Sequence, residues 1–215
     1  MGGWSLGDEP PSPRQQRASE NSVRQIRFAL QVIRESLSSG SPFELSVELI
    51  CELHRIAMDG LVDNPGEPRT TDREDNKIRG SRHEPPPSRD VARHLSEMCA
   101  YCNDARHDAV HAAAYVLWRI NWIHPFSPDG NGRTARVAAL IVLFTRLGEE
   151  PVGHRDQLTL LELVAARRNE YYRALEAADD ASKAGGLEVT ELERILDEAL
   201  TQSVIGATAS SRSRS

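Results

Sequence analysis

A chain of 215 residues, of which 39% are hydrophobic, is long enough for one globular domain with tails, or for one domain and a small accessory piece. Its formal net charge of −6 argues against direct binding of nucleic acid, which attracts an excess of Lys and Arg. No apolar run approaches the ~20 residues of a membrane span, and the N-terminus lacks the basic start and apolar core of a signal peptide. We therefore expect a cytoplasmic protein, and three cysteines, an odd number, fit a reducing compartment.

The first half of the chain reads as a tail, two helices and a polar segment. Residues 1–19 are rich in Pro, Gly, Ser and Gln and are expected to form a disordered tail. Apolar residues at helical spacing predict one helix from Glu20 to about residue 37 and a second over about 44–59. Residues 61–87 contain scattered Gly and Pro with little periodicity, which indicates irregular structure.

The second half is dominated by helical patterns. Five further helices are predicted, over 89–103, 108–123, 134–147, 156–177 and 187–201. An Asp- and Gly-rich link is expected at 178–186, and residues 203–215 form a low-complexity tail.

The link between the helices predicted at 108–123 and 134–147 carries the residues best suited to chemistry. It contains Pro and two Gly, so the two helices cannot be continuous, and the N-terminus of the second one faces the link. Free backbone N–H groups and the positive end of the helix dipole make such a place an anion site. His124 is a titratable base near neutral pH, and Asp129 is a hard oxygen ligand suited to Mg²⁺.

The rest of the link fits the same chemistry. Gly130 and Gly132 let the backbone approach a ligand closely, and Asn131 can cap the helix or hold a phosphate oxygen. Arg133 and Arg136 are three residues apart, so both can face one anion. A base, a metal-binding carboxylate, an open backbone and two guanidinium groups together indicate phosphoryl or nucleotidyl transfer.

Residues 124–136 read HPFSPDGNGRTAR. This stretch resembles the signature of the Fic family: His-Pro-Phe, one variable residue, Asp or Glu, Gly-Asn, Gly or Lys, Arg, and a second Arg three residues later. The resemblance extends over roughly residues 22–177 and implies an all-α Fic fold, a bundle of about seven helices with a small β-hairpin flap. The Fic domain is expected to span 20–202, with the flap at about 64–87.

The resemblance also implies an activity. Most members of the family transfer AMP from ATP to a hydroxyl group of a target protein, here a Ser, Thr or Tyr. By that resemblance His124 is the general base and Asp129 holds Mg²⁺ between the α- and β-phosphates. The nucleotide-binding residues that it implies are Phe126, Gly130, Asn131, Gly132, Arg133 and Arg136, the last on the γ-phosphate.

One departure from the signature keeps other functions open. Ser127 and Pro128 separate Phe126 from Asp129, where the family usually has one residue. A displacement of about 1 Å in such a loop can lower a rate ~10²-fold, so one alternative is a nucleotide-binding or regulatory module with weakened catalysis. Another is transfer from a different nucleotide, such as UTP or CDP-choline, because the signature holds phosphates and says little about the base.

Many family members carry an inhibitory Glu in the pattern Ser or Thr, three residues, Glu, then Gly or Asn. Glu20 and Asn21 match the end of this pattern, but Gln16 stands where Ser or Thr is required. The match is weak, so the remaining expectation is restraint by a separate inhibitory chain, by homo-oligomerisation or by the longer signature loop itself.

A zinc site is a competing interpretation elsewhere in the chain. Cys99 and Cys102 form a CxxC pair, and His107 and His111 follow. The two cysteines lie in a helical pattern with apolar neighbours, where Cys behaves as a small hydrophobic residue, so we expect a core position. We expect His111 on a solvated helix face.

Four aromatic residues need an assignment. Trp118 and Trp122 are four residues apart and are expected in the core. Of Tyr171 and Tyr172, one is expected to face the core, while the other lines the nucleotide pocket or serves as a site of self-modification.

Overall fold

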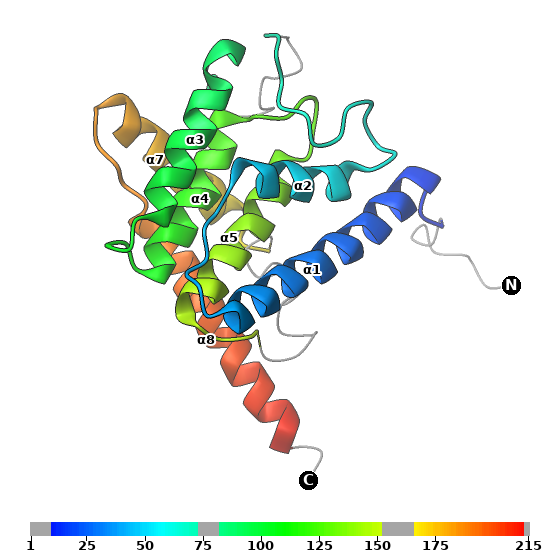
Figure 1. The fold of residues 1–215 in the computed structure, drawn as a ribbon, viewed down its shortest axis with the longest axis vertical. Coiled ribbons are helices and arrows are strands. Elements are labelled where there is room, and N and C mark those ends of the chain that lie inside the picture. The colour runs from blue at the N-terminus through cyan, green and yellow to red at the C-terminus, as the bar shows by residue number, and fades with distance from the viewer. Residues whose placement is uncertain (1–9, 73–81, 152–165, 213–215) are drawn as a thin grey trace, which may run out of the picture.

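The computed structural model describes residues 10–72, 82–151 and 166–212 (Figure 1). Within these ranges it contains seven α-helices, one short 3-10 helix and no strand: α1 (Pro13–Ser39), α2 (Val47–Met58), η2 (Ser88–Asp90), α3 (Val91–Asn103), α4 (Ala109–Ile123), α5 (Asn131–Leu147), α7 (Arg168–Lys183) and α8 (Thr190–Arg212). The all-α expectation is confirmed for this part of the chain. None of its helices has both the length and the apolar character that crossing a membrane requires.

Helices α4 and α5 form the centre of the bundle. Both are apolar around most of their circumference, as expected for helices that are surrounded by others. In Figure 1 the remaining helices lie around this pair: α1 and α2 pack against α5, while α3, α7 and α8 pack against α4. The loop between α4 and α5 is thus held at one end of the core, and its two ends cannot move independently of the core.

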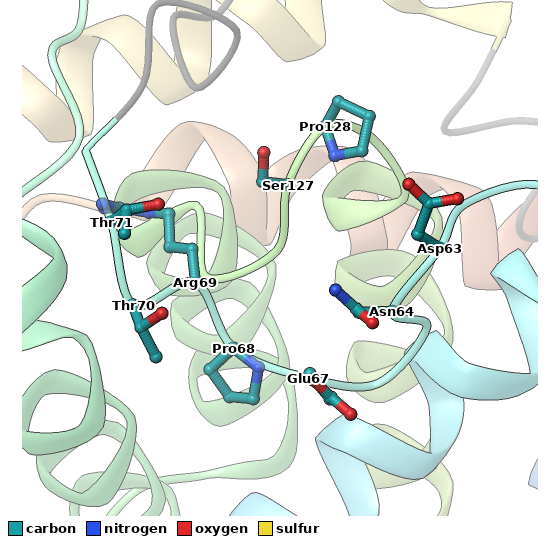
Figure 2. A pocket seen from close by; sticks show the side chains of 9 residues that line it. All are labelled: Asp63, Asn64, Glu67, Pro68, Arg69, Thr70, Thr71, Ser127 and Pro128. Atoms are coloured by element: carbon teal, nitrogen blue, oxygen red, sulfur yellow. The ribbon is translucent and has the colours of Figure 1, made fainter.

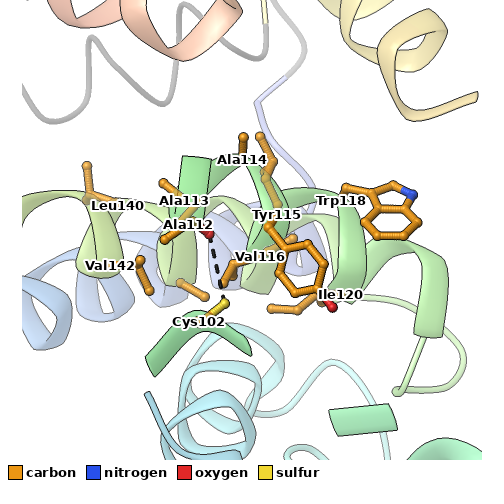
Figure 3. Close-up of a cluster of buried hydrophobic side chains, with 14 of the residues drawn as sticks. Cys102, Ala112, Ala113, Ala114, Tyr115, Val116, Trp118, Ile120, Leu140 and Val142 are labelled. Atoms are coloured by element: carbon orange, nitrogen blue, oxygen red, sulfur yellow. Dashed lines mark hydrogen bonds between the residues drawn. The ribbon is translucent and has the colours of Figure 1, made fainter. Parts of the chain in front are cut away.

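Small side chains let the helices approach closely. Figure 3 shows Ala112, Ala113 and Ala114 of α4 among larger residues of the core, with the thiol of Cys102 on α3 pointing at the Ala112 carbonyl. The Cys102 sulfur donates to that oxygen at 3.9 Å. Burial raises the thiol pKa of Cys99 to about 12, which keeps it protonated at neutral pH. The expectation that these cysteines are core residues is therefore confirmed.

The structure gives no support to zinc and changes the assignment of one histidine. Among the described residues, no three His, Cys, Asp or Glu side chains are arranged to hold a metal ion. His111 was expected on a solvated face, but its Nε2 lies 2.8 Å from the Tyr101 hydroxyl and its Nδ1 lies 2.6 Å from Glu193 Oε1. That expectation was wrong in part: α8 packs beside α4 and covers much of the histidine, whose side chain remains 24% exposed.

Several element boundaries differ from the sequence prediction. α1 begins at Pro13 rather than Glu20, because Ser12 caps the helix: its hydroxyl accepts from the Gln15 N–H, and the Gln15 side chain accepts from the Ser12 N–H. The expected disordered tail was therefore wrong for residues 13–19. α7 continues through most of the expected link at 178–186, where Asp179 is buried against α4.

At the C-terminus α8 runs to Arg212, although a low-complexity tail was expected from residue 203; no proline interrupts this stretch. In Figure 1 the last turns of α8 extend beyond the rest of the bundle. For the expected flap, residues 64–72 and 82–87 contain no strand, and its central residues 73–81 lie outside the described part of the chain. The first part of the helix expected over 156–177, residues 156–165, also lies outside it, and most of the remainder belongs to α7, which begins at Arg168.

Candidate active site

The site begins where α4 ends. His124 is the C-terminal cap of α4 and lies in the left-handed region, with φ 48° and ψ 57°, while its N–H donates to the Ile120 carbonyl at 2.9 Å. A residue with a Cβ adopts this backbone conformation only at a cost of order 1–3 kcal/mol, so the surroundings must hold it. The turn at His124 ends the helix and directs the chain into the loop.

Arg69 provides much of that restraint. Its side chain is buried, and its Nε donates to the His124 carbonyl at 2.9 Å. The Nη2 atom donates to the carbonyls of Ile123 and Pro86, and the backbone N–H donates to the Pro125 carbonyl at 2.7 Å. A guanidinium group at the C-terminal end of a helix also complements the helix dipole. One side chain from the preceding segment therefore fixes the position of His124.

Asn131 closes the loop from the other side. Its Oδ1 accepts from the Phe126 N–H at 2.9 Å, and its Nδ2 donates to the Phe126 carbonyl at 2.7 Å. Both residues are buried. This pair of hydrogen bonds joins the residue two after His124 to the first residue of α5, so the intervening residues form a closed turn.

His54 of α2 contacts the same turn. Its ring stacks on Phe126, and its Nε2 lies 2.9 Å from the Asp129 carbonyl oxygen. Its Nδ1 accepts from the Gly66 N–H at 2.8 Å, so the proton of the neutral ring is on Nε2, which donates to Asp129. Burial lowers the pKa of His54 to about 4, which keeps the ring neutral and this pattern intact at neutral pH.

Gly130 is required at its position for two reasons. Its φ is 101°, in the region that only glycine adopts without strain. A Cβ at this residue would lie 2.6 Å from His54 Nε2 and 2.7 Å from Met58 Cγ. The backbone of the loop can lie directly on α2 because no side chain stands between them.

The first turn of α5 follows directly. Gly130 is the N-cap, and no side chain caps the helix; the Thr134 N–H is bonded to the Gly130 carbonyl. A helix start without a side-chain cap leaves N–H groups that attract an anion. Arg133 Nη2 donates to Asp129 Oδ2 at 2.9 Å, and Asp129 Oδ1 accepts from the Gly130 N–H at 2.6 Å.

Arg136 lies one turn further along, on the side of Gly132 and Asn121. Its Nη1 would be 3.6 Å from a Cβ at Gly132, and its charge acts on the buried hydroxyl of Tyr171. Tyr171 accepts from Asn121 Nδ2 at 3.0 Å, while Tyr172 is exposed, so Tyr171 is the core-facing member of that pair. Arg136 makes no ion pair with the residues that the structure describes, and its charge remains available to an anion.

The imidazole of His124 is suited to accept a proton. Burial, and after it the positive charge of the nearby Arg69, lowers the pKa of His124 to about 4. The ring is therefore neutral at pH 7. Its Nδ1 is enclosed on the side of the Asn121 backbone, so Nε2 is the nitrogen that a substrate hydroxyl can reach.

A cavity of about 300 Å³ adjoins the loop (Figure 2). Ser127 and Pro128 form one wall, and the segment after α2 forms the other. Figure 2 shows the Asp63 carboxylate and the Asn64 amide on the side opposite Thr70 and Thr71; the lining residues are Asp63, Asn64, Glu67, Pro68, Arg69, Thr70, Thr71, Ser127 and Pro128.

Comparison with known proteins identifies the arrangement. Residues 44–143 match the sequence model of the Fic/DOC family. Protein adenylyltransferase fic-1 of Caenorhabditis briggsae is 30% identical over 164 residues, which cover 74% of this chain and 29% of that protein. The chain belongs to the Fic/DOC family. It spans less than a third of the length of this relative.

Solved structures of the Fic/DOC family share the fold. A Fic family protein from Desulfovibrio desulfuricans G20 has a TM-score of 0.66 at 21% identity, over 95% of this chain and 56% of that one. A fragment of Fic-1 from Caenorhabditis elegans has a TM-score of 0.63 at 25% identity, over 96% and 56% of the two chains.

The Fic signature residues lie together despite the extra residue in the loop. Asp129 remains at the start of α5, bonded to the Gly130 N–H and Arg133, and His124 is close enough for Asp129 to affect its pKa. Ser127 and Pro128 line the cavity (Figure 2).

Sequence reasoning assigned no role to His54 or to Arg69. His54 follows Leu53 on the buried face of α2, which is a local signal for a polar residue with a buried partner, whereas Arg69 lies in a polar segment that gives no such signal. The contacts described above include none with Glu20, the residue that matches the inhibitory Glu of the family pattern. Glu20 is exposed and accepts from the Gln16 side chain, and these described residues form no ion pair with Arg136.

Proposed function

We propose that this protein transfers AMP from ATP to a Ser, Thr or Tyr hydroxyl group of a target protein. The observation that carries the proposal is the start of α5, which has no side-chain cap and lies between a neutral His124 and an Arg136 that makes no ion pair within the described part of the chain. The triphosphate is bound there by the backbone N–H groups of Gly132 and Arg133 and by the guanidinium group of Arg136.

The reaction uses His124 as the general base. Its Nε2 takes the proton of the target hydroxyl, whose oxygen forms a bond to the α-phosphorus of ATP. The bond between the α-phosphorus and the bridging oxygen breaks, and pyrophosphate leaves with its electron pair. Arg133 and Arg136 stabilise the charge that develops on the leaving group.

The residues present also fit a Mg²⁺ ion. The Asp129 side chain is 61% exposed and is the carboxylate beside the start of α5, and Mg²⁺ prefers such hard oxygen ligands. Asp129 would hold the ion, which when bound neutralises phosphate charge. Arg133 pairs with the same carboxylate, so it must release Asp129 before the metal can bind.

That ion pair favours a second candidate, a nucleotide-binding module with weak or no transfer. Both oxygens of Asp129 already have partners, Gly130 and Arg133, and the loop carries one residue more than the family signature. An exposed pair of this kind is worth only about 0–1 kcal/mol, however, so bound nucleotide and metal can open it. Because so little energy holds this ion pair, we rank AMP transfer above the nucleotide-binding module.

Labelled nucleotides decide between the candidates. The protein is incubated in lysate with Mg²⁺ and ATP labelled at the α-phosphate, in parallel with His124→Ala. We expect labelled protein bands with the wild type and none with the variant; labelling that persists in His124→Ala removes the mechanism. Nucleotide binding without transfer supports the second candidate. Parallel samples with labelled UTP and CDP-choline test whether the transferred group is AMP.

A further inference from the structure

A buried histidine outside the signature holds the last turn of α4. The His83 side chain is 5% exposed, and its Nε2 lies 2.7 Å from the Trp122 carbonyl oxygen. A carbonyl oxygen can only accept, so Nε2 carries the proton and donates it. Trp122 stands two residues before His124, and its carbonyl is one of the four that an α-helix leaves without a partner at its C-terminus.

Asp179 of α7 lies against this histidine. Its Oδ2 lies 3.4 Å from His83 Nδ1, and its Oδ1 accepts from the indole N–H of Trp118 at 2.8 Å. Trp118 and Trp122 are one turn apart on α4. The contacts therefore close a ring that leaves α4 at Trp118, passes through Asp179 and His83, and returns to α4 at Trp122.

The ring complements the contacts of Arg69. Arg69 binds the carbonyls of Ile123 and His124, while His83 binds that of Trp122, so three consecutive carbonyls at the end of α4 have buried partners. His124 itself has φ 48° and is not a glycine, so it needs such restraint to keep its conformation. A buried pair contributes more to orientation than an exposed one, because its members cannot exchange their partners for water.

We propose that His83 and Asp179 are a positioning pair for His124, which keeps the last turn of α4, and with it the imidazole, in the one orientation that faces the start of α5. The pair touches neither nucleotide nor target and acts only through α4. The inference rests on the proposed function in so far as His124 is the base.

Three variants test the role in transfer. His83→Ala removes the contact with Trp122, whereas His83→Gln can place an amide N–H near the position of Nε2 and keep it. His94→Ala is the matched control, because the His94 ring contacts the same Trp122 edge-on at 5.1 Å but does not reach its carbonyl. We expect kcat to fall roughly 10- to 100-fold in His83→Ala with KM for ATP within about twofold. His83→Gln should recover most of the rate, and His94→Ala should keep it.

Two results overturn the proposal. One is an unchanged kcat in a folded His83→Ala protein. The other is a loss that His83→Gln does not recover and that His94→Ala shares, which points to general packing around Trp122. If His83→Ala does not fold, His83→Gln and Asp179→Asn replace it: Asn can still accept from Trp118 and donate to His83 Nδ1, so both should retain the wild-type rate within about threefold.

A measurement without transfer separates this inference from the proposed function. In ¹⁵N-histidine-labelled protein, the ring signals of His124, assigned with His124→Ala, should be single in the wild type and in His94→Ala. In His83→Ala they should split or broaden, because the imidazole samples several orientations. If the wild type transfers no AMP, the proposed function fails and the ring signals still decide; single, unshifted His124 signals in His83→Ala contradict positioning.

Discussion

The imidazole of His54 stacks on the ring of Phe126, with the ring centroids 3.9 Å apart and the planes 8° from parallel. The same imidazole holds the Asp129 carbonyl at 2.9 Å. One side chain of α2 thus binds the loop on both sides of Ser127 and Pro128. This is how a signature loop with an additional residue keeps Asp129 at the start of α5: the two ends of the longer stretch are fixed to the same ring.

Replacing His54 by leucine should destabilise the fold. Leucine fills a similar volume against Phe126, but the Gly66 N–H and the Asp129 carbonyl lose their partner. Leaving such groups unsatisfied predicts a loss of about 2–4 kcal/mol in the free energy of unfolding, measured by urea denaturation. Arg89→Ala, at a side chain that is 82% exposed, is the control and should change it by less than about 0.5 kcal/mol. A loss below about 1 kcal/mol in His54→Leu contradicts this account of the loop.

The same histidine predicts how stability depends on pH. His54 has a pKa of about 4 in the folded protein and about 6.5 when unfolded, so between these values the unfolded chain binds more protons. The neutral ring contributes fully above pH 6.5, and its contribution is lost as the pH falls toward 4. The shift corresponds to about 3 kcal/mol. His124 has a similar shift and the same sign.

Urea unfolding at pH 7, 6 and 5 checks this dependence. The wild type should lose stability steadily across the series, before most carboxylates titrate. His54→Gln, which cannot take up a proton in this range, should show a shallower slope from a lower starting stability. Equal slopes in the two proteins would show that His54 is not held neutral.

The sequence was informative where chemistry and local signals coincide. Helical spacing predicted α2, α3 and α4 to within a few residues, and the order of residue types from His124 to Arg136 predicted both the turn and the family. It was less informative where tertiary contacts decide. α7 continues past residue 177 because Asp179 is buried against Trp118, and nothing in the local sequence indicates that partner.

The supporting residues of the site were missed for the same physical reason. Arg69, His83 and His54 each bind backbone carbonyls of segments distant in sequence, and the value of such a contact depends on where those carbonyls lie. A single sequence shows a polar residue in a loop or on an apolar helix face, but it does not show which carbonyls that residue binds. The sequence indicates the types of catalytic residue, whereas the residues that hold them in place are seen only in the fold.

Asp129→Asn should remove the effect of Mg²⁺ on nucleotide binding. The amide has one oxygen in place of the two of the carboxylate and carries no charge, so it holds a hard cation poorly. In titration calorimetry, the wild type should bind ATP more tightly with Mg²⁺ than with EDTA, while Asp129→Asn should bind it equally in both. Asp197→Asn, at an exposed carboxylate on α8, is the control and should behave as the wild type. A Mg²⁺ effect that survives in Asp129→Asn assigns the metal to another ligand.

The two glycines that flank Asn131 should respond oppositely to alanine. In Gly130→Ala the new Cβ meets His54 Nε2 at 2.6 Å and Met58 Cγ at 2.7 Å, at a φ of 101°, which predicts a loss of about 2–4 kcal/mol in the free energy of unfolding. In Gly132→Ala the nearest atom is 3.6 Å away and the residue lies in the first turn of α5, so stability should be unchanged or rise by up to about 1 kcal/mol.

Gly132→Ala should lower activity even though it does not destabilise the fold. The Gly132→Ala protein is folded, but its methyl group stands beside Arg136 where the phosphates approach the backbone, so AMP transfer should fall at least 10-fold with KM for ATP raised. Thermal unfolding and transfer assays on the two variants and the wild type make the comparison. If Gly130→Ala is as stable as Gly132→Ala, the loop does not lie on α2 as described; if Gly132→Ala transfers AMP at the wild-type rate, the phosphates bind elsewhere.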